Sequence, residues 1–415
     1  MANDCVIICE EIMPFIKIPN RHCNSIYFAI LFPLGSIDDP NGKAGMAHLT
    51  EHMMFRKAGT LTQKDIYDKS ESLGIKINAK TGKTFIYFKF ACRKDVFDEA
   101  ITLLSDMLKE THYTDKDLQR EKAVVSAEIL QTESTNMQVI FDSRWQESAF
   151  ENPILGTGKS IEAISLQDVV EYKARLLNSD FSIVLVGNFN VTTVKCVTNL
   201  FPQKNFAANA EKSLRETNLP ARQNVLQFVH DKSEVIDVYY SYYAADSFPD
   251  DVLCLFVLDN VLFRGDKAFV TEHLRENLGC VYEVDSYFAK FSNQLNWIFK
   301  LTVHKNNLTK TLLNLEKLLH DFVLSERYFQ YVKAFCCDNL PMLCDDLDYL
   351  CTSTLWNYTN LNLWLTPEEF AQRISQLNLK QCDEFLHRIN QDKKVYIFGK
   401  IPRKLQQEIA SIVKG

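Results

Sequence analysis

The pattern of apolar and polar residues predicts strands, turns and helices in the same order in both halves of the chain. In the first half it predicts a strand at Ser25–Leu34, a turn at Gly35–Gly42 and a helix over Ala44–Phe55. Further helices are predicted at Gln63–Leu73, Val96–Thr111 and Asp115–Thr132, and strands at Thr84–Phe88 and Phe181–Gly187. This mixture of helices and strands is typical of an α+β protein.

The second half repeats this order. A strand at Val235–Ala244 precedes a turn at Ser247–Asp251 and a helix at Val252–Phe263. A second helix is predicted at Ala268–Leu278, followed by strands at Val281–Phe288, Leu295–Val303 and Lys394–Gly399. We interpret the repetition as an internal duplication. It predicts two similar domains, each with a mixed or antiparallel sheet flanked by helices: residues 1–203 and 223–415, joined by a polar linker at 204–222.

The amino-acid composition excludes several classes of protein. The chain has 415 residues, of which 46% are hydrophobic, so a packed globular protein is expected. Its net charge of −7 argues against a nucleic-acid binder, which needs a basic surface. No apolar run is long enough to span a bilayer and no basic leader precedes one, so we expect a cytoplasmic protein without a membrane span. The 12 cysteines include no CxxC pair, which makes a thiol-based redox protein a distant alternative.

The sequence His48–Leu49–Thr50–Glu51–His52 carries the clearest chemistry. Residues i and i+4 of a helix share a face, so both imidazoles can bind one metal ion. Glu51 lies on nearly the same face and can act as general base towards a metal-activated water. The spacing is the reverse of the commoner HExxH motif.

Such a site needs a third protein ligand and one open position for water. Glu121 and Glu128 lie seven residues apart on the predicted helix Asp115–Thr132 and therefore share a face. Either carboxylate could reach a neighbouring helix, although two glutamates at this spacing are more often a solvated surface.

Together these motifs resemble the pitrilysin/insulinase family of zinc peptidases, which includes the mitochondrial processing peptidases. Residues Gly45–Phe55 are similar to its GxAHxxEHxxF motif, and Glu121–Glu128 to the motif of its second helix. The resemblance implies that His48, His52 and Glu128 bind Zn²⁺, that Glu51 is the general base, and that Glu121 orients the site from outside the ligand set. The loop Phe55–Thr60 is two residues longer than the family's usual pattern. It contains no proposed ligand, so we expect it to alter only the local shape of the pocket.

Two further segments resemble substrate-binding motifs of this family. Gly74–Thr81 resembles its G…NAxT segment, which places Asn78 and Ala79 beside an extended peptide substrate. Leu274–Tyr282 resembles its R…LG.aY motif, in which an arginine and a tyrosine bind substrate and stabilise the oxyanion. By this match Arg275 and Tyr282 take those roles.

Aligning the two halves places Phe256, Asp259 and Asn260 where His48, Glu51 and His52 stand, so we expect one zinc per chain. In the family, two two-domain halves enclose the catalytic chamber. The resemblance therefore implies a dimeric endopeptidase for peptides or small unfolded polypeptides, most simply a homodimer, with a heterodimer of related subunits as the alternative. A maturation protease for one precursor, working with a different subunit, and a non-catalytic peptide-binding subunit remain open.

Overall fold

The computed structural model describes residues 15–109, 112–132, 140, 149–202, 226–230, 235–244, 249–265, 267–291 and 294–414. The chain divides into two compact units. Unit 1 consists of Met1–Leu219 with Cys344–Thr359, and unit 2 of Pro220–Leu343 with Asn360–Gly415. The predicted linker 204–222 lies outside the described residues. Residues 344–359, which the sequence assigned to the second domain, are grouped with unit 1.

Unit 1 is built on a five-stranded sheet in the order β1-β7-β2-β6-β5. Its strands are β1 (Phe15–Pro19), β2 (Ser25–Phe32), β5 (Asn78–Thr81), β6 (Ile86–Arg93) and β7 (Ser182–Gly187). β1 pairs with β7 in parallel, and every other pair in the sheet is antiparallel. A separate hairpin joins β3 (Lys57–Ala58) to β4 (Leu61–Thr62).

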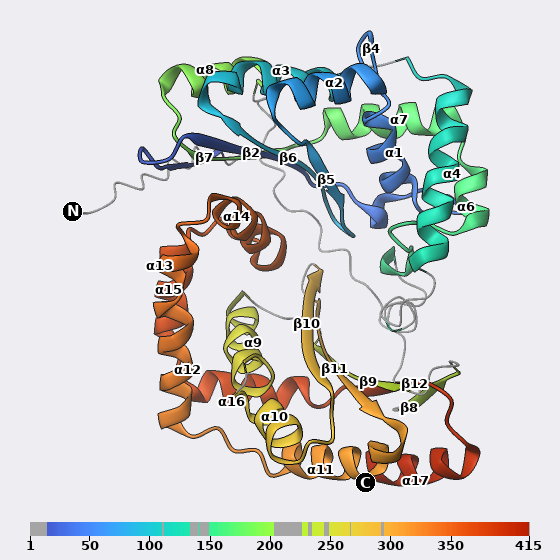
Figure 1. The fold of residues 1–415 in the computed structure, drawn as a ribbon, viewed down its shortest axis with the longest axis vertical. Helices are drawn as coiled ribbons and strands as arrows, with labels where there is room; N and C mark the ends of the chain where they lie inside the picture. The colour runs from blue at the N-terminus through green and yellow to red at the C-terminus, as the bar shows by residue number, and fades with distance from the viewer. Residues whose placement is uncertain are drawn as a thin grey trace. The chain divides into compact units, whose positions relative to one another are not determined.

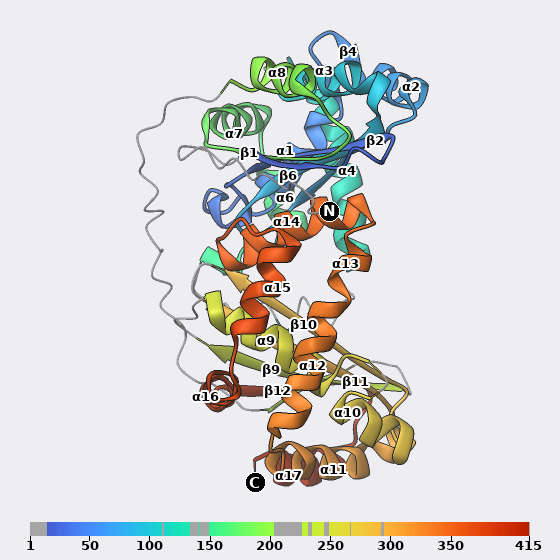
Figure 2. The same cartoon turned by 90° about the vertical axis from the view of Figure 1, so that its left-hand side faces the viewer.

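Helices cover both faces of this sheet (Figure 1). They are α1 (Met46–Met54), α2 (Gln63–Leu73), α3 (Phe97–Met107), α4 (Asp115–Thr132), α6 (Gly158–Ala163), α7 (Leu166–Asn178), α8 (Val191–Leu200) and α14 (Leu347–Leu361). The even-numbered residues of β6 are buried in one hydrophobic core with α1, α3 and α7. On the opposite face, Lys89 of β6 pairs with Asp348 of α14 at 2.8 Å. Figure 2 shows α3 and α8 on the side of the sheet away from α14.

Unit 2 has a five-stranded sheet in the order β10-β11-β9-β12-β8. Its strands are β8 (Leu226–Val229), β9 (Val235–Ala244), β10 (Glu283–Phe291), β11 (Gln294–His304) and β12 (Lys393–Phe398). β8 pairs with β12 in parallel and the remaining pairs are antiparallel. Counted from the parallel pair, both sheets have the same connectivity, which confirms the predicted α+β fold with two similar domains.

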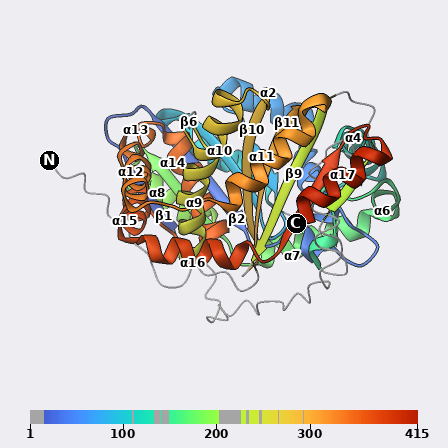
Figure 3. The same cartoon turned by 90° about the horizontal axis from the view of Figure 1, so that it is seen from below.

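The helices of unit 2 are α9 (Pro249–Leu262), α10 (Phe269–Thr271), α11 (Leu308–His320), α12 (Glu326–Asp338), α13 (Leu340–Leu343), α15 (Pro367–Gln376), α16 (Leu379–Ile389) and α17 (Arg403–Lys414). α11 and α17 lie side by side (Figure 3). The predicted helix at Ala268–Leu278 is one short α-helical turn followed by a π-helical segment, Glu272–Asn277. Among the described residues no helix is long and apolar enough to cross a membrane.

Candidate metal centre

The position of α1 depends on a buried carboxylate at its N-terminus. Gly45 precedes the helix with φ of +90°, and a Cβ there would come within 2.7 Å of the Leu155 carbonyl oxygen, so only glycine fits. The Gly45 and Ala47 amides donate to the two Asp39 oxygens at 2.7 and 2.9 Å. Burial raises the pKa of Asp39 to about 7. Asp39 lies in the predicted turn Gly35–Gly42, and no pattern in the sequence indicated its contacts with residues six and eight positions further on.

Asp39→Ala is expected to lower the free energy of unfolding by about 1–2 kcal/mol, since it removes the acceptor for two N-terminal amides. It is also expected to weaken zinc binding, because α1 carries His48 and His52. Thr366→Ala is the control, because Thr366 caps α15 of unit 2, which holds no candidate ligand. Urea unfolding and zinc titration of the metal-free protein measure both effects. Equal zinc affinity in the two variants would contradict a role for Asp39 in holding the site.

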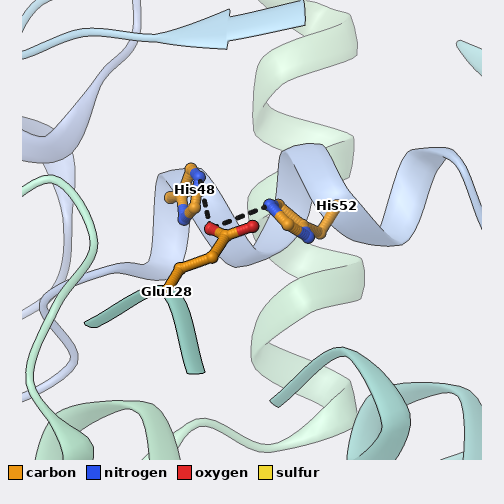
Figure 4. A group of neighbouring side chains, drawn as sticks. All are labelled: His48, His52 and Glu128. Carbon is orange, nitrogen blue, oxygen red and sulfur yellow. Dashed lines mark ion pairs between the residues drawn. The ribbon is translucent and has the colours of Figure 1, made fainter. Parts of the chain in front are cut away.

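Two histidines of α1 and one glutamate of α4 converge on one point (Figure 4). Nε2 of His48 lies 3.8 Å and Nε2 of His52 lies 3.6 Å from the same Glu128 oxygen, Oε2. One ligand atom from each residue lies within 4.8 Å of the others. Two imidazole nitrogens and a carboxylate oxygen are the donor set of an open zinc site, so these residues fit that ion. Burial, together with the neighbouring His52, lowers the pKa of His48 to about 3, which keeps its ring neutral.

Glu51 lies on the buried side of α1 beside this group. Its side chain accepts a hydrogen bond from Thr81 Oγ1, which connects α1 to the edge strand β5. Burial raises the pKa of Glu51, and the hydrogen bond from Thr81 opposes that effect. Thr81 is the last residue of the segment that resembles NAxT, and that resemblance did not predict its contact with Glu51.

Glu121 contacts the opposite side of His52. Its Oε2 lies 3.1 Å from His52 Nδ1, and its Oε1 is paired with Nε of Arg56. Burial favours neutral His52, but its hydrogen bond with Glu121 and the charges of Glu128 and Glu51 outweigh burial and raise its pKa. The structure thus separates the two glutamates of α4: Glu128 approaches the nitrogens that face the candidate metal position, and Glu121 approaches the far ring nitrogen. The expectation that loop Phe55–Thr60 affects only pocket shape was too narrow, because Arg56 contacts Glu121.

The candidate substrate-binding residues lie in both units. Asn78 and Ala79 belong to β5, which pairs with β6 and forms an edge of its sheet among the described strands. Arg275 lies in the π-helical segment of unit 2, and its Nε is 3.4 Å from Oε1 of Glu276. Tyr282 precedes β10 and is 83% exposed. Arg275 and Tyr282 are therefore in a different unit from His48, His52 and Glu128.

In unit 2, the positions that align with the candidate metal site of unit 1 include an ion pair, formed by Asp259 and Arg264. Asp259 is fully buried, accepts a hydrogen bond from Trp297 Nε1 at 2.8 Å, and is paired with Arg264. No histidine takes part in these contacts. Within the described ranges, His48, His52 and Glu128 are the single group found that could hold a metal ion.

Comparison with known proteins agrees with this architecture. Residues 19–158 match the model of the insulinase family, peptidase family M16, and residues 163–334 match the model of the peptidase M16 inactive domain. A zinc protease of Rickettsia bellii is 24% identical over 373 residues, which cover 87% of this chain and 88% of that protein. The beta subunit of the human mitochondrial-processing peptidase is 30% identical over 133 residues, 31% of this chain and 27% of that subunit.

Solved structures share the fold. A protease from Helicobacter pylori superposes with a TM-score of 0.80 at 15% identity, covering 94% of this chain and 97% of that chain. The periplasmic protease PqqL from Escherichia coli has a TM-score of 0.74 at 15% identity, covering 98% of this chain but 49% of that chain. The two family models account for most of the sequence, and two relatives that align over nearly the full length are named zinc proteases. The chain therefore belongs to the insulinase family of peptidases, family M16.

Proposed function

We propose that this chain is a zinc-dependent endopeptidase whose single metal site is formed by His48, His52 and Glu128. The observation that carries the proposal is the convergence of both Nε2 atoms on one Glu128 oxygen, with the Glu51 carboxylate buried beside them. Zinc bound there would activate a water molecule and polarise the scissile carbonyl. The match of residues 163–334 to the inactive domain of the family supports one site per chain.

In the proposed reaction, Glu51 accepts a proton from the attacking water and passes it to the leaving amine. Burial raises the pKa of Glu51 above its ordinary value, which makes its carboxylate a stronger base. Asn78 and Ala79 offer main-chain groups at the edge of β5 to an extended peptide, so affinity depends little on side-chain sequence. Arg275 and Tyr282 donate hydrogen bonds to the developing oxyanion.

A fluorogenic peptide assay tests the function directly. Treatment with a chelator is expected to abolish cleavage, because a catalytic zinc is required, and one equivalent of Zn²⁺ per chain is expected to restore it. A control incubation with the chelator already saturated with one equivalent of Zn²⁺ separates metal removal from direct inhibition by the chelator. Cleavage that persists in fully metal-depleted protein would reject a zinc peptidase.

We further propose a homodimer in which each chain supplies Arg275 and Tyr282 to the zinc site of the other. The length ratio supports pairing, since this chain covers 49% of the single-chain PqqL structure. A heterodimer is the second candidate, favoured by the similarity to a beta subunit of the mitochondrial-processing peptidase. Native mass spectrometry of the purified chain distinguishes them. A monomer that cleaves peptides only after a second protein is added would reject the homodimer and favour a dedicated processing protease.

A further inference from the structure

Arg56 lies two residues beyond the end of α1 and is largely buried. Its Nε is paired with Oε1 of Glu121, and its Nη1 donates a hydrogen bond to Oε1 of Gln63 at 2.8 Å. The side chains of Arg56 and Glu121 are 12% and 5% exposed. The guanidinium is thus held from two directions, by α4 and by the first turn of α2. A charge pair in such a site is much less screened by water than one on the surface.

The same carboxylate also contacts a candidate zinc ligand. While Oε1 of Glu121 is paired with Arg56, Oε2 lies 3.1 Å from Nδ1 of His52. A carboxylate in this position accepts a hydrogen bond from Nδ1–H of the ring, which leaves Nε2 as the nitrogen with a free lone pair. Nε2 is the atom that faces Glu128. Arg56, Glu121 and His52 therefore form a chain of contacts that ends at the candidate metal position.

Unit 2 contains an equivalent arginine without a histidine. In the aligned halves Arg264 corresponds to Arg56, and it is paired with the buried carboxylate of Asp259 and donates to the Ser286 carbonyl oxygen at 3.1 Å. The other Asp259 oxygen accepts from Trp297 rather than from a metal ligand. Both arginines therefore compensate a buried carboxylate, but only the carboxylate paired with Arg56 contacts a candidate ligand.

We infer that Arg56 is a positioning residue of the zinc site: by anchoring Glu121 it fixes the orientation and tautomer of His52. The inference rests on the proposed zinc site and adds a residue to which neither the motif nor the proposed reaction assigns a role. The side-chain contacts of Arg56 are with Glu121 and Gln63 and not with a candidate ligand, so its effect passes through Glu121. Its loss leaves the Glu121 carboxylate without the group that holds it against His52.

Zinc affinity of the metal-free protein, measured by competition with a chromophoric chelator, is the readout. Arg56→Met keeps the aliphatic stem and is expected to weaken zinc binding about 10–100-fold, the range for groups that orient metal ligands from outside the ligand set. Arg56→Lys keeps the charge but cannot reach Glu121 and Gln63 together, so an intermediate affinity is expected. Glu121→Gln is expected to weaken zinc binding by a similar factor. The double variant with Arg56→Met and Glu121→Gln is expected to bind zinc only slightly more weakly than either single variant, because both changes act through one contact.

Arg264→Met is the matched control. It is expected to destabilise unit 2, as judged by urea unfolding, while zinc affinity stays within about twofold of the unaltered protein. Zinc affinity within twofold in Arg56→Met would overturn the inference, as would an equal loss in Arg264→Met. If Arg56→Met does not fold, Arg56→Lys decides: unchanged affinity overturns the inference and a partial loss supports it. An unaltered protein that binds no zinc would instead reject the proposed function, and this inference with it.

Discussion

A Glu51→Gln variant is expected to bind zinc as the unaltered protein does and to lose about 10²–10⁴-fold in kcat/KM, the usual contribution of a general base. Glutamine keeps the size of the side chain and an oxygen that can accept the Thr81 hydrogen bond, but it cannot take up a proton. The geometry around His48, His52 and Glu128 should therefore survive. Metal analysis and a peptide assay on the same sample measure the two properties independently.

The Glu51 variant is also expected to remain folded. Burial raises the pKa of Glu51 in the folded protein. The stability linked to its protonated form is present below the pKa of the unfolded chain and is lost as pH rises through the higher folded value. Glutamine has no charge to bury, so the unfolding free energy near pH 7 should be equal or higher. Asp259→Asn, at the aligned position in unit 2, is the control and should leave peptidase activity unchanged in protein that remains folded. A Glu51→Gln enzyme that cleaves peptides at nearly the original rate would reject Glu51 as the base.

Loss of a metal ligand is expected to have the second large effect, on metal content as well as on activity. His48→Ala removes one of the two imidazoles, and Glu128→Gln replaces the carboxylate oxygen between them with a neutral amide. Each variant should lose more zinc affinity than the 10–100-fold typical of groups that only orient ligands. Zinc content after dialysis, and the affinity of the metal-free protein, measure this loss.

Two exposed residues provide controls for these variants. His22→Ala removes an imidazole that belongs to no candidate site, and Asp115→Asn removes a carboxylate from the first turn of α4. Both should retain full zinc content and activity. If His48→Ala and Glu128→Gln also retain one zinc per chain, the metal is held elsewhere and the assignment of this site is wrong.

Local features of the site could be predicted from the sequence because they depend on spacing along one element. His48 and His52 face the same way since they are one helical turn apart, and the structure places their ring centroids 4.6 Å apart. The duplicated order of elements likewise predicted two similar sheets, and both have the same connectivity. The π-helical segment Glu272–Asn277 was not predicted, because its apolar spacing differs little from that of an α-helix.

Contacts between different helices and strands could not be predicted from the sequence and are seen only in the folded structure. Spacing puts Glu121 and Glu128 on one face of α4, but helical periodicity cannot say which carboxylate meets which histidine nitrogen. That choice depends on how α4 packs against α1, and the packing sets Glu128 near both Nε2 atoms and Glu121 near Nδ1 of His52. The same holds for Asp39 at the start of α1 and for Thr81, whose strand lies thirty positions beyond Glu51.

The amino-acid order alone therefore determines the inventory of this protein: two similar α+β halves, a histidine pair with an adjacent glutamate, and two further glutamates on one helix face. The tertiary structure decides which of these side chains contact one another. It brings Arg56 to Glu121 and Asp348 of α14 to Lys89, although the latter residues are 259 positions apart. The physical reason is the range of the forces involved. Backbone periodicity acts over one or two turns, whereas the partner of a buried charge is set by the packing of whole helices and sheets.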